Sequence, residues 1–290
     1  MAEPIQSKSY RSDLSKEKLH ALKFQEHPFL TSADPRFLYL SKQHLSVLDR
    51  VEDAINYREG LAVIEGRIGV GKTSIARRLY DMHYDDDSCK IVYIHTATYS
   101  TDKEAASDIA RAFGLPINRA LIVQLRNFEE YLVKIRKEDK NTIVIIDDAQ
   151  KMSTKSLDAI QSFLNFDISV KLIQIILFGQ PEIHEPFSQN EAVLDRVSSW
   201  QRLTPLPADD ALNMIQFRIN VAGRQDPLMT DGGFLKLYEY TEGVPRSIIL
   251  VCNEILHILA RQAAKIADIP EVLEAIQNVQ TRKTFIKENE

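Results

Sequence analysis

A glycine-rich turn between a short apolar run and a helical pattern carries the residues best suited to chemistry in this sequence. Gly66-Arg67-Ile68-Gly69-Val70-Gly71-Lys72-Thr73 has the spacing G-x-x-x-x-G-K-T. A triphosphate needs backbone N–H groups that converge on its oxygens, and a glycine-permissive turn at a helix N-terminus supplies them. Lys72 is expected to lie against the β- and γ-phosphates and Thr73 to ligate Mg²⁺. The sequence therefore predicts ATP and Mg²⁺ as cofactors, with contacts from Gly66, Arg67, Ile68, Gly69, Val70, Gly71, Lys72, Thr73 and Ser74.

The segments on both sides of this turn have the patterns that would position such a loop. Leu61-Ala62-Val63-Ile64 is a continuous apolar run typical of a buried strand. The segment after the turn places Ile75, Leu79 and Met82 on one helical face. A glycine-rich turn that arose by chance would not need either flank, so the pattern favours a phosphate-binding loop.

A second candidate site lies where another apolar run ends in two aspartates. Ile143-Val144-Ile145-Ile146 is followed directly by Asp147 and Asp148. Such a strand delivers Asp147 to the carboxyl edge of the sheet, beside the phosphate loop, where it can hold a water of the Mg²⁺ shell. Asp148 stands where a hydrolytic enzyme places a carboxylate that orients the attacking water. A helix cap is the alternative for both aspartates.

Two further polar residues have positions from which they could reach a nucleotide. Gln180 follows the apolar run that ends at Phe178, so its amide is expected at the same sheet edge. Arg246 follows Pro245, which pre-sets the first turn of a helix. Such a cation could close onto the γ-phosphate. Taken alone, Gln180 could also be an ordinary turn residue, and Arg246 could be an ordinary surface residue.

Composition and charge exclude several other classes of protein. The 290 residues carry a formal net charge of −5, so no global basic surface for nucleic acid is expected. No apolar run approaches the roughly 20 residues that cross a bilayer, and the first residues are polar. Cys89 and Cys252 are far apart and have no metal-type cysteine spacing. These features predict a cytoplasmic protein with no membrane segment.

Apolar runs alternate with amphipathic helical patterns up to about residue 204, which predicts a parallel sheet flanked by helices. The expected strands are Leu61–Ile64, Lys90–His95, Thr142–Asp147 and Leu172–Phe178. Beyond Thr204-Pro205-Leu206-Pro207 the pattern is entirely helical, with helices expected at Asp209–Ala222, Asp231–Thr241, Arg246–Ala264 and Pro270–Val279. We expect an N-terminal arm over residues 1–26, an α/β nucleotide-binding domain over 27–204, a small all-α lid over 205–280 and a tail over 281–290.

Together these elements resemble those of the AAA+ ATPase superfamily. Gly66–Thr73 is similar to its Walker A motif, Ile143–Asp148 to Walker B, Gln180 to the sensor-one residue and Arg246 to the sensor-two arginine. The resemblance runs from about His27 to Ala264 and narrows to the ExeA-like ATPases, which include general-secretion ExeA proteins and TnsC-type transposition regulators. The blocks shared with that group are Pro28-Phe29, Asp34 to Ser41, Asp148-Ala149-Gln150, Gly179-Gln180-Pro181-Glu182 and Gly243-Val244-Pro245-Arg246.

The resemblance implies an AAA+ fold and an ATPase whose sites lie between the subunits of a homo-oligomer, as a ring or a helical filament. The implied catalytic residues are Lys72, Asp148, Gln180, Arg196 and Arg246. Arg196 is the preferred arginine acting on the neighbouring subunit's nucleotide, and Arg202 is the alternative or a structural residue. Phe29 and Tyr39 are expected to wall the adenine, with packing of the N-terminal segment as the alternative.

The family usually has Asp-Glu at Walker B, whereas this chain has Asp147-Asp148. Aspartate is one methylene shorter, and a misplacement of about 1 Å can cost on the order of 100-fold in rate. The resemblance therefore implies slow hydrolysis, which suits a timer better than a motor.

Two functions follow from the resemblance. The preferred one is an ATP-dependent regulator of DNA transposition that binds double-stranded DNA and links a target-selector protein to a transposase. Lys103, Arg119 and Arg126 are its candidate DNA contacts. The alternative is an ExeA-like ATPase for secretion or pilus assembly, and a nucleotide-gated switch without a DNA role is a third reading.

Overall fold

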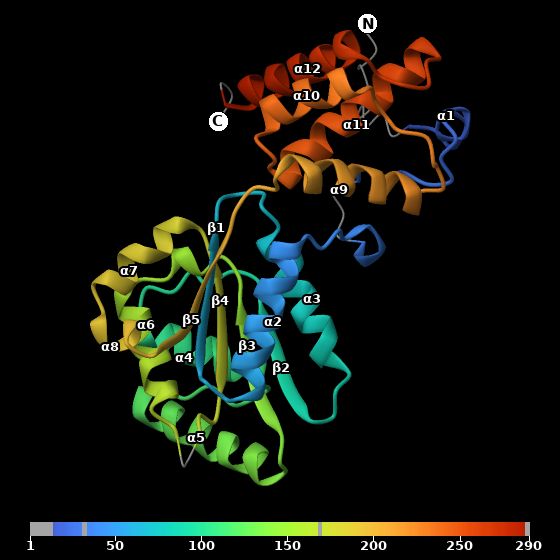
Figure 1. Cartoon of the computed structure of the whole chain (residues 1–290). Coiled ribbons are helices and arrows are strands. Elements are labelled where there is room, and N and C mark those ends of the chain that lie inside the picture. Colours follow the sequence, from blue (N-terminus) through green and yellow to red (C-terminus); the bar gives the residue numbers. More distant parts are fainter. Residues whose placement is uncertain (1–13, 31–33, 168–169, 288–290) are drawn as a thin grey trace, which may run out of the picture. The chain divides into compact units, whose positions relative to one another are not determined.

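The computed structural model describes residues 14–30, 34–167 and 170–287, and the chain divides into two compact units (Figure 1). One unit runs from Leu40 to Leu206 and is called the α/β unit here. The other combines the described residues up to Tyr39 with those from Pro207 onward and is called the helical unit.

The α/β unit is built on one parallel sheet with the strand order β2-β3-β4-β1-β5. The strands are β1 (Leu61–Gly66), β2 (Cys89–Ile94), β3 (Asn141–Ile146), β4 (Gln174–Gly179) and β5 (Val197–Leu203). Every residue of β1, β3 and β4 is buried, which explains why these three strands are apolar almost throughout. The sequence therefore placed the three central strands close to their observed positions.

Helices cover both faces of this sheet. On one face, α2 (Lys42–Asn56) and α3 (Lys72–Tyr84) bury their apolar residues against β1, β3 and β4. The other face is covered by α4 (Asp102–Ala112), α5 (Leu121–Lys137), α6 (Thr154–Leu164) and the short helices α7 (His184–Ser188) and α8 (Glu191–Leu194). Single turns of 3₁₀ helix follow β3 (Ala149–Lys151) and β4 (Pro181–Ile183). The predicted α/β fold class is confirmed.

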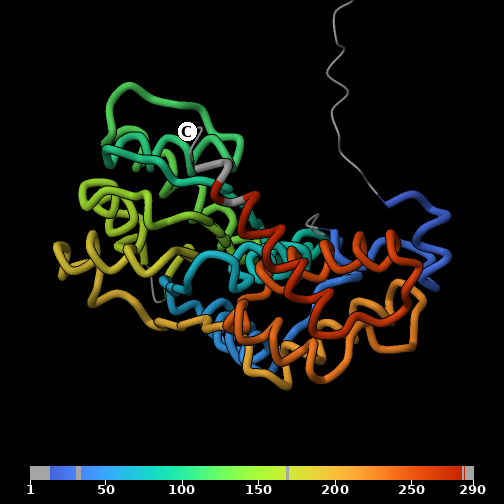
Figure 2. The backbone as a smooth tube through the Cα atoms, turned by 90° about the horizontal axis from the view of Figure 1, so that it is seen from above, coloured from blue at the N-terminus to red at the C-terminus, as the bar shows by residue number. Residues whose placement is uncertain are grey.

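The helical unit contains α9 (Ala208–Val221), α10 (Asp231–Thr241), α11 (Pro245–Gln262) and α12 (Ile269–Lys287). Two short N-terminal elements join them, α1 (Lys16–Ala21) and a 3₁₀ turn (Pro35–Phe37). In Figure 2 the blue N-terminal segment runs beside the orange and red helices, and α1 contacts α11. This unit thus draws on both ends of the sequence.

The division of the chain differs from the predicted boundaries because a buried arginine binds the N-terminal segment. Residues 27–39 were expected in the α/β domain, but the described ones among them, 27–30 and 34–39, cluster with the helices that follow Pro207. The Arg218 guanidinium on α9 donates to the carbonyl oxygens of Pro28 (2.8 Å), Leu30 (3.1 Å) and Phe37 (2.8 Å). A buried guanidinium needs several acceptors. A contact between segments so far apart in the chain leaves no local sequence pattern, so it could not be predicted.

Two further differences concern the limits of elements. β5 was not predicted, because this edge strand, Val-Ser-Ser-Trp-Gln-Arg-Leu, is more than half polar and lacks a continuous apolar run. Helix α12 continues to Lys287, beyond the predicted lid limit at residue 280. Of the predicted N-terminal arm, residues 1–13 lie outside the described residues.

Candidate nucleotide-binding site

The glycine-rich loop joins the end of β1 to the start of α3, as the sequence predicted. Gly69 and Gly71 have φ values of 85° and 108°, a backbone region that L side chains rarely adopt. At Gly66 an added Cβ would lie 2.8 Å from the carbonyl oxygen of Leu203, so only glycine fits beside β5. The loop therefore has the tight backbone course that directs N–H groups into its centre at the start of a helix.

Lys72 begins α3, and its ammonium points back into the loop. It donates to the carbonyl oxygens of Gly66 (2.7 Å) and Arg67 (3.1 Å). Burial lowers the pKa of Lys72, while the negative charges of Asp147, Asp148 and Glu182 act in the opposite direction. A buried cation surrounded by the loop backbone is suited to an anionic group such as a phosphate.

Thr73 and Asp147 meet beside the loop. The Thr73 hydroxyl donates to Asp147 Oδ2 at 2.7 Å, and the Tyr93 hydroxyl at the end of β2 donates to the same oxygen at 3.0 Å. Burial, together with the charge of Asp147, raises the pKa of Tyr93, so this phenol keeps its proton. A hydroxyl and a carboxylate side by side are the hard oxygen groups that fit Mg²⁺. Tyr93 was not predicted, since an aromatic residue in a strand carries no specific signal.

Asp148 has a left-handed backbone, with φ 53° and ψ 33°. Its carboxylate accepts from Lys151 Nζ (2.8 Å) and Gln150 Nε2 (3.3 Å). The hydrogen bond from Lys151 holds the pKa of Asp148 below its usual value despite partial burial. The side chain forms no capping bond to the short helix that follows, so the cap alternative lacks its defining contact. Gln150 also accepts from the backbone N–H of Gln180 (3.0 Å) and so connects the ends of β3 and β4.

Glu65 forms a charged cluster directly before the loop. Its buried carboxylate contacts the Arg202 guanidinium on β5 and the His184 imidazole on α7. Burial raises the pKa of Glu65, but the hydrogen bond from Arg202 and the charges of His184 and Arg202 bring it below the usual value. This cluster was not predicted. A carboxylate at the end of an otherwise apolar strand was the available signal, because it requires a cationic partner.

The two candidate trans-acting arginines make contacts inside their own unit. Arg202 pairs with Glu65. Arg196, just before β5, donates to the carbonyl oxygen of Ala192 and to Asn165 Oδ1 (2.8 Å). Arg202 thus has a structural role in this state of the chain, and the trans role of Arg196 stays a prediction.

Phe29, Tyr39 and Arg246 belong to the helical unit. Phe29 is fully buried, and Tyr39 donates to Asp210 (2.9 Å) and packs its ring against Phe217. The burial of Phe29 and the contacts of Tyr39 are those expected of the packing alternative, and the adenine wall stays a prediction. Arg246 is exposed in the first turn of α11, and its role as a sensor stays a prediction.

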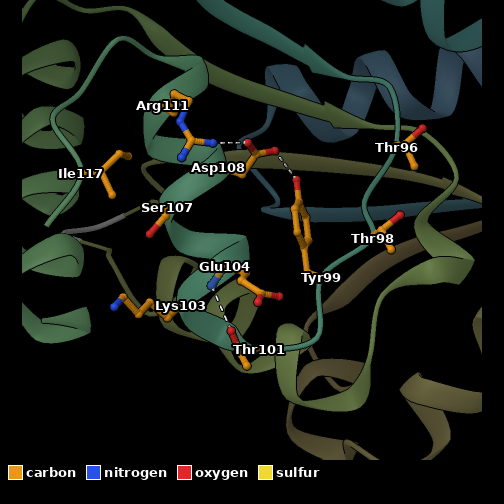
Figure 3. Close-up of a pocket in the computed structure, with 10 residues that line it drawn as sticks. All are labelled: Thr96, Thr98, Tyr99, Thr101, Lys103, Glu104, Ser107, Asp108, Arg111 and Ile117. Atoms are coloured by element: carbon orange, nitrogen blue, oxygen red, sulfur yellow. Dashed lines mark hydrogen bonds and ion pairs between the residues drawn. The ribbon is translucent and has the colours of Figure 1, made fainter. Parts of the chain in front are cut away.

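Of the three candidate DNA contacts, Lys103 lies on α4, Arg126 on α5 and Arg119 in the connection between these helices. Lys103 lines a polar pocket of about 570 Å³, shown in Figure 3. Within that pocket Asp108 accepts from Tyr99 (2.6 Å) and from Arg111 (2.9 Å), so carboxylates lie among its cations. Arg119 and Arg126 are exposed. Neither they nor Lys103 form an ion pair with another described residue, which is compatible with a phosphate contact and equally with solvation.

Comparison with known proteins agrees with this geometry. A family model for the AAA domain matches residues 55–187, which span the loop, β3 and β4. The α/β unit has a P-loop fold of the AAA+ type. The archaeal Aeropyrum pernix ORC2 protein in its ADP form has a TM-score of 0.64 at 15% identity, over 88% of this chain and 73% of that one. A Drosophila ORC structure with bound DNA has a TM-score of 0.63 at 13% identity, over 95% and 69%. At these identities the likeness establishes the fold alone.

Among curated proteins, the general secretion pathway protein A of Aeromonas hydrophila is 27% identical over 236 residues. The match covers 80% of this chain and 43% of that protein, so the chain spans less than half of this relative's length. In the part of the chain that the structure describes, no helix has the length and apolarity needed to cross a membrane.

Proposed function

We propose that this chain binds ATP with Mg²⁺ and hydrolyses it, and that the nucleotide state controls its self-assembly. The observation that carries the proposal is the set of groups brought together in the α/β unit: a loop with positive φ at Gly69 and Gly71, the buried Lys72, and Thr73 bonded to Asp147. Gly66 to Ser74 enclose the phosphates, and Lys72 exchanges its bonds to the loop carbonyls for bonds to phosphate oxygens.

Thr73 and Asp147 would hold Mg²⁺, which supplies charge neutralisation on the phosphates. Tyr93 fixes the rotamer of Asp147 through its hydrogen bond. Asp148 orients the attacking water after its carboxylate leaves Lys151, and Gln180 and Arg246 report on the γ-phosphate. Because Asp148 must give up an ion pair and is short, turnover is slow.

At the level of cellular role, we propose a nucleotide-dependent assembly ATPase of the ExeA type. The similarity to general secretion pathway protein A supports this reading more than the transposition reading. The transposition regulator with target-selector and transposase partners shares the same nucleotide site, and no contact in the described residues speaks for those partners. DNA binding by Lys103, Arg119 and Arg126 and a cytoplasmic location remain predictions.

The two readings differ in what triggers assembly. Sedimentation velocity of the full chain is measured with ATP or ADP, each with and without duplex DNA. The secretion reading predicts ATP-dependent oligomers without DNA. Assemblies that form only when ATP and duplex DNA are both present would establish the transposition hypothesis instead. In that case the logarithm of the DNA affinity should fall linearly with the logarithm of the salt concentration.

A pair of lysine variants connects assembly to the site. Lys72→Ala removes the cation inside the loop and should abolish ATP-dependent assembly. Lys155→Ala removes an exposed cation on α6 and should assemble as the wild type does. Equal assembly by both variants would contradict nucleotide control through this loop.

A further inference from the structure

A cluster of metal-ligating side chains lies where α3 ends and β2 begins. His83 Nδ1 is 3.7 Å from Cys89 Sγ, and Cys89 Sγ is 3.8 Å from Asp86 Oδ2. All three ligand atoms lie within 4.8 Å of one another. His83 is buried, Cys89 half-buried and Asp86 exposed, so one side of the cluster is open to solvent.

These separations are close to those of a tetrahedral site. With metal–sulfur bonds of about 2.3 Å and metal–nitrogen or metal–oxygen bonds of about 2.1 Å, tetrahedral angles place sulfur about 3.6 Å from each other ligand atom. The two distances from Cys89 Sγ exceed that value only slightly. The third pair, His83 Nδ1 and Asp86 Oδ2, lies within 4.8 Å. A tetrahedral ion would draw these two atoms to about 3.4 Å from each other, and the exposed Asp86 side chain is the one free to move.

Neighbouring groups already orient two of the ligands. Glu52 on α2 pairs with His83 Nε2 at 2.8 Å, which leaves Nδ1 directed at Cys89. A carboxylate on the outer nitrogen is the usual partner of a metal-binding histidine. The backbone N–H of Ser88 donates to Asp86 Oδ1 at 2.8 Å, so Oδ2 remains for a metal.

We propose that His83, Asp86 and Cys89 bind a divalent transition-metal ion of the Zn²⁺ class, with water in the fourth position. A thiolate, an imidazole and a carboxylate select such an ion over Mg²⁺, which takes oxygen ligands. Helix α3 runs from Lys72 to this cluster, a distance of about 16 Å along its axis at 1.5 Å per residue. The ion would join α3 to β2 without touching the nucleotide, and the proposal is independent of the ATPase activity.

Cobalt reports this site without interference from the nucleotide site. Co²⁺ is titrated into the reduced, chelator-treated full chain without nucleotide, and the thiolate-to-cobalt charge-transfer absorption is followed. Thr73 and Asp147 offer no sulfur, so only a cysteine-bound ion gives this band. The wild type should reach one Co²⁺ per chain, and added Zn²⁺ should remove the band.

Variants identify the ligands. Cys89→Ala should lose the band, while Cys252→Ala, which removes the second of the two cysteines, should keep it. Asp86→Asn should weaken binding at least tenfold and its exposed neighbour Asp87→Asn should not. Glu52→Gln should weaken binding about 10- to 100-fold by releasing His83. Absence of the band in the wild type, its survival in Cys89→Ala, or equal affinities of Asp86→Asn and Asp87→Asn would overturn the site.

Discussion

Asp148→Asn separates a catalytic role of this residue from a structural one. Asparagine has nearly the same shape and tolerates the left-handed backbone at φ 53°, so the turn after β3 should be preserved. It also keeps an oxygen that can accept from Lys151. What it loses is the negative charge that would orient and activate water.

The expected magnitudes differ sharply between stability and turnover. The ion pair is partly exposed, with 37% of the Asp148 side chain and 45% of the Lys151 side chain accessible, so losing it costs about 0.5 kcal/mol at most. Loss of a positioned general base typically lowers turnover by about 100-fold or more. Asp148→Glu lengthens the carboxylate by one methylene and should raise turnover. Because glutamate does not share the tolerance of asparagine for this backbone, it should also lower stability by on the order of 1 kcal/mol.

Steady-state phosphate release with Mg²⁺ and ATP is the assay, with thermal unfolding and nucleotide affinity measured on the same preparations. Asp148→Asn should bind ATP as tightly as the wild type while its turnover collapses. Undiminished turnover in Asp148→Asn would refute the assignment of Asp148 as the water-orienting carboxylate.

Three further predictions test other parts of the structure. Gly71→Ala introduces strain of about 1–3 kcal/mol at φ 108° inside the loop and should weaken ATP binding. Gly114→Ala, at φ 76° with open space around it, should lower only the melting temperature, and equal ATP affinities of the two variants would contradict this prediction. The pKa of Glu65 is lowered from 4.5 in the folded protein, so its contribution to stability is present above pH 4.5 and is lost as the pH falls through the lower folded-state pKa. In urea unfolding, the free energy of unfolding should therefore decrease less on acidification in Glu65→Gln than in the wild type. Arg218→Met leaves three carbonyl oxygens without their donor and should lower the unfolding free energy by about 3 kcal/mol or more. Proteolysis of residues 27–39 should become faster, and a rate equal to that of the wild type would contradict the role of Arg218 in holding this segment.

The parts of the fold that the sequence predicted are those written in local patterns. The strand, turn and helix around Gly66–Thr73 and the strand before Asp147 each carry their signal within a few residues. The roles of β5 and Arg218 depend instead on distant partners. β5 is a half-polar edge strand, and Arg218 on a helix reads as a surface residue until its three carbonyl partners are known.

The proposed metal site at His83, Asp86 and Cys89 was also not predicted from the sequence. Its cysteine was judged only against the other cysteine, at position 252, and that comparison gave no metal-type spacing. His83 and Asp86 are identified as further ligands because the structure brings their ligand atoms within 4.8 Å of Cys89 Sγ. It also places Glu52 on α2 at 2.8 Å from His83 Nε2. The spacing of His83, Asp86 and Cys89 in the sequence, without the contact from Glu52, is weak evidence for a metal site.

Calorimetric titration of the full chain with Mg²⁺ and a non-hydrolysable ATP analogue tests the central claim most directly. The wild type and Lys155→Ala should each bind one nucleotide per chain with the same affinity. Lys72→Ala should lose about 100-fold or more, because a charge-assisted contact to phosphate inside a buried loop contributes roughly 3 kcal/mol. Unchanged binding by Lys72→Ala, or no binding by the wild type, would contradict nucleotide binding at this loop.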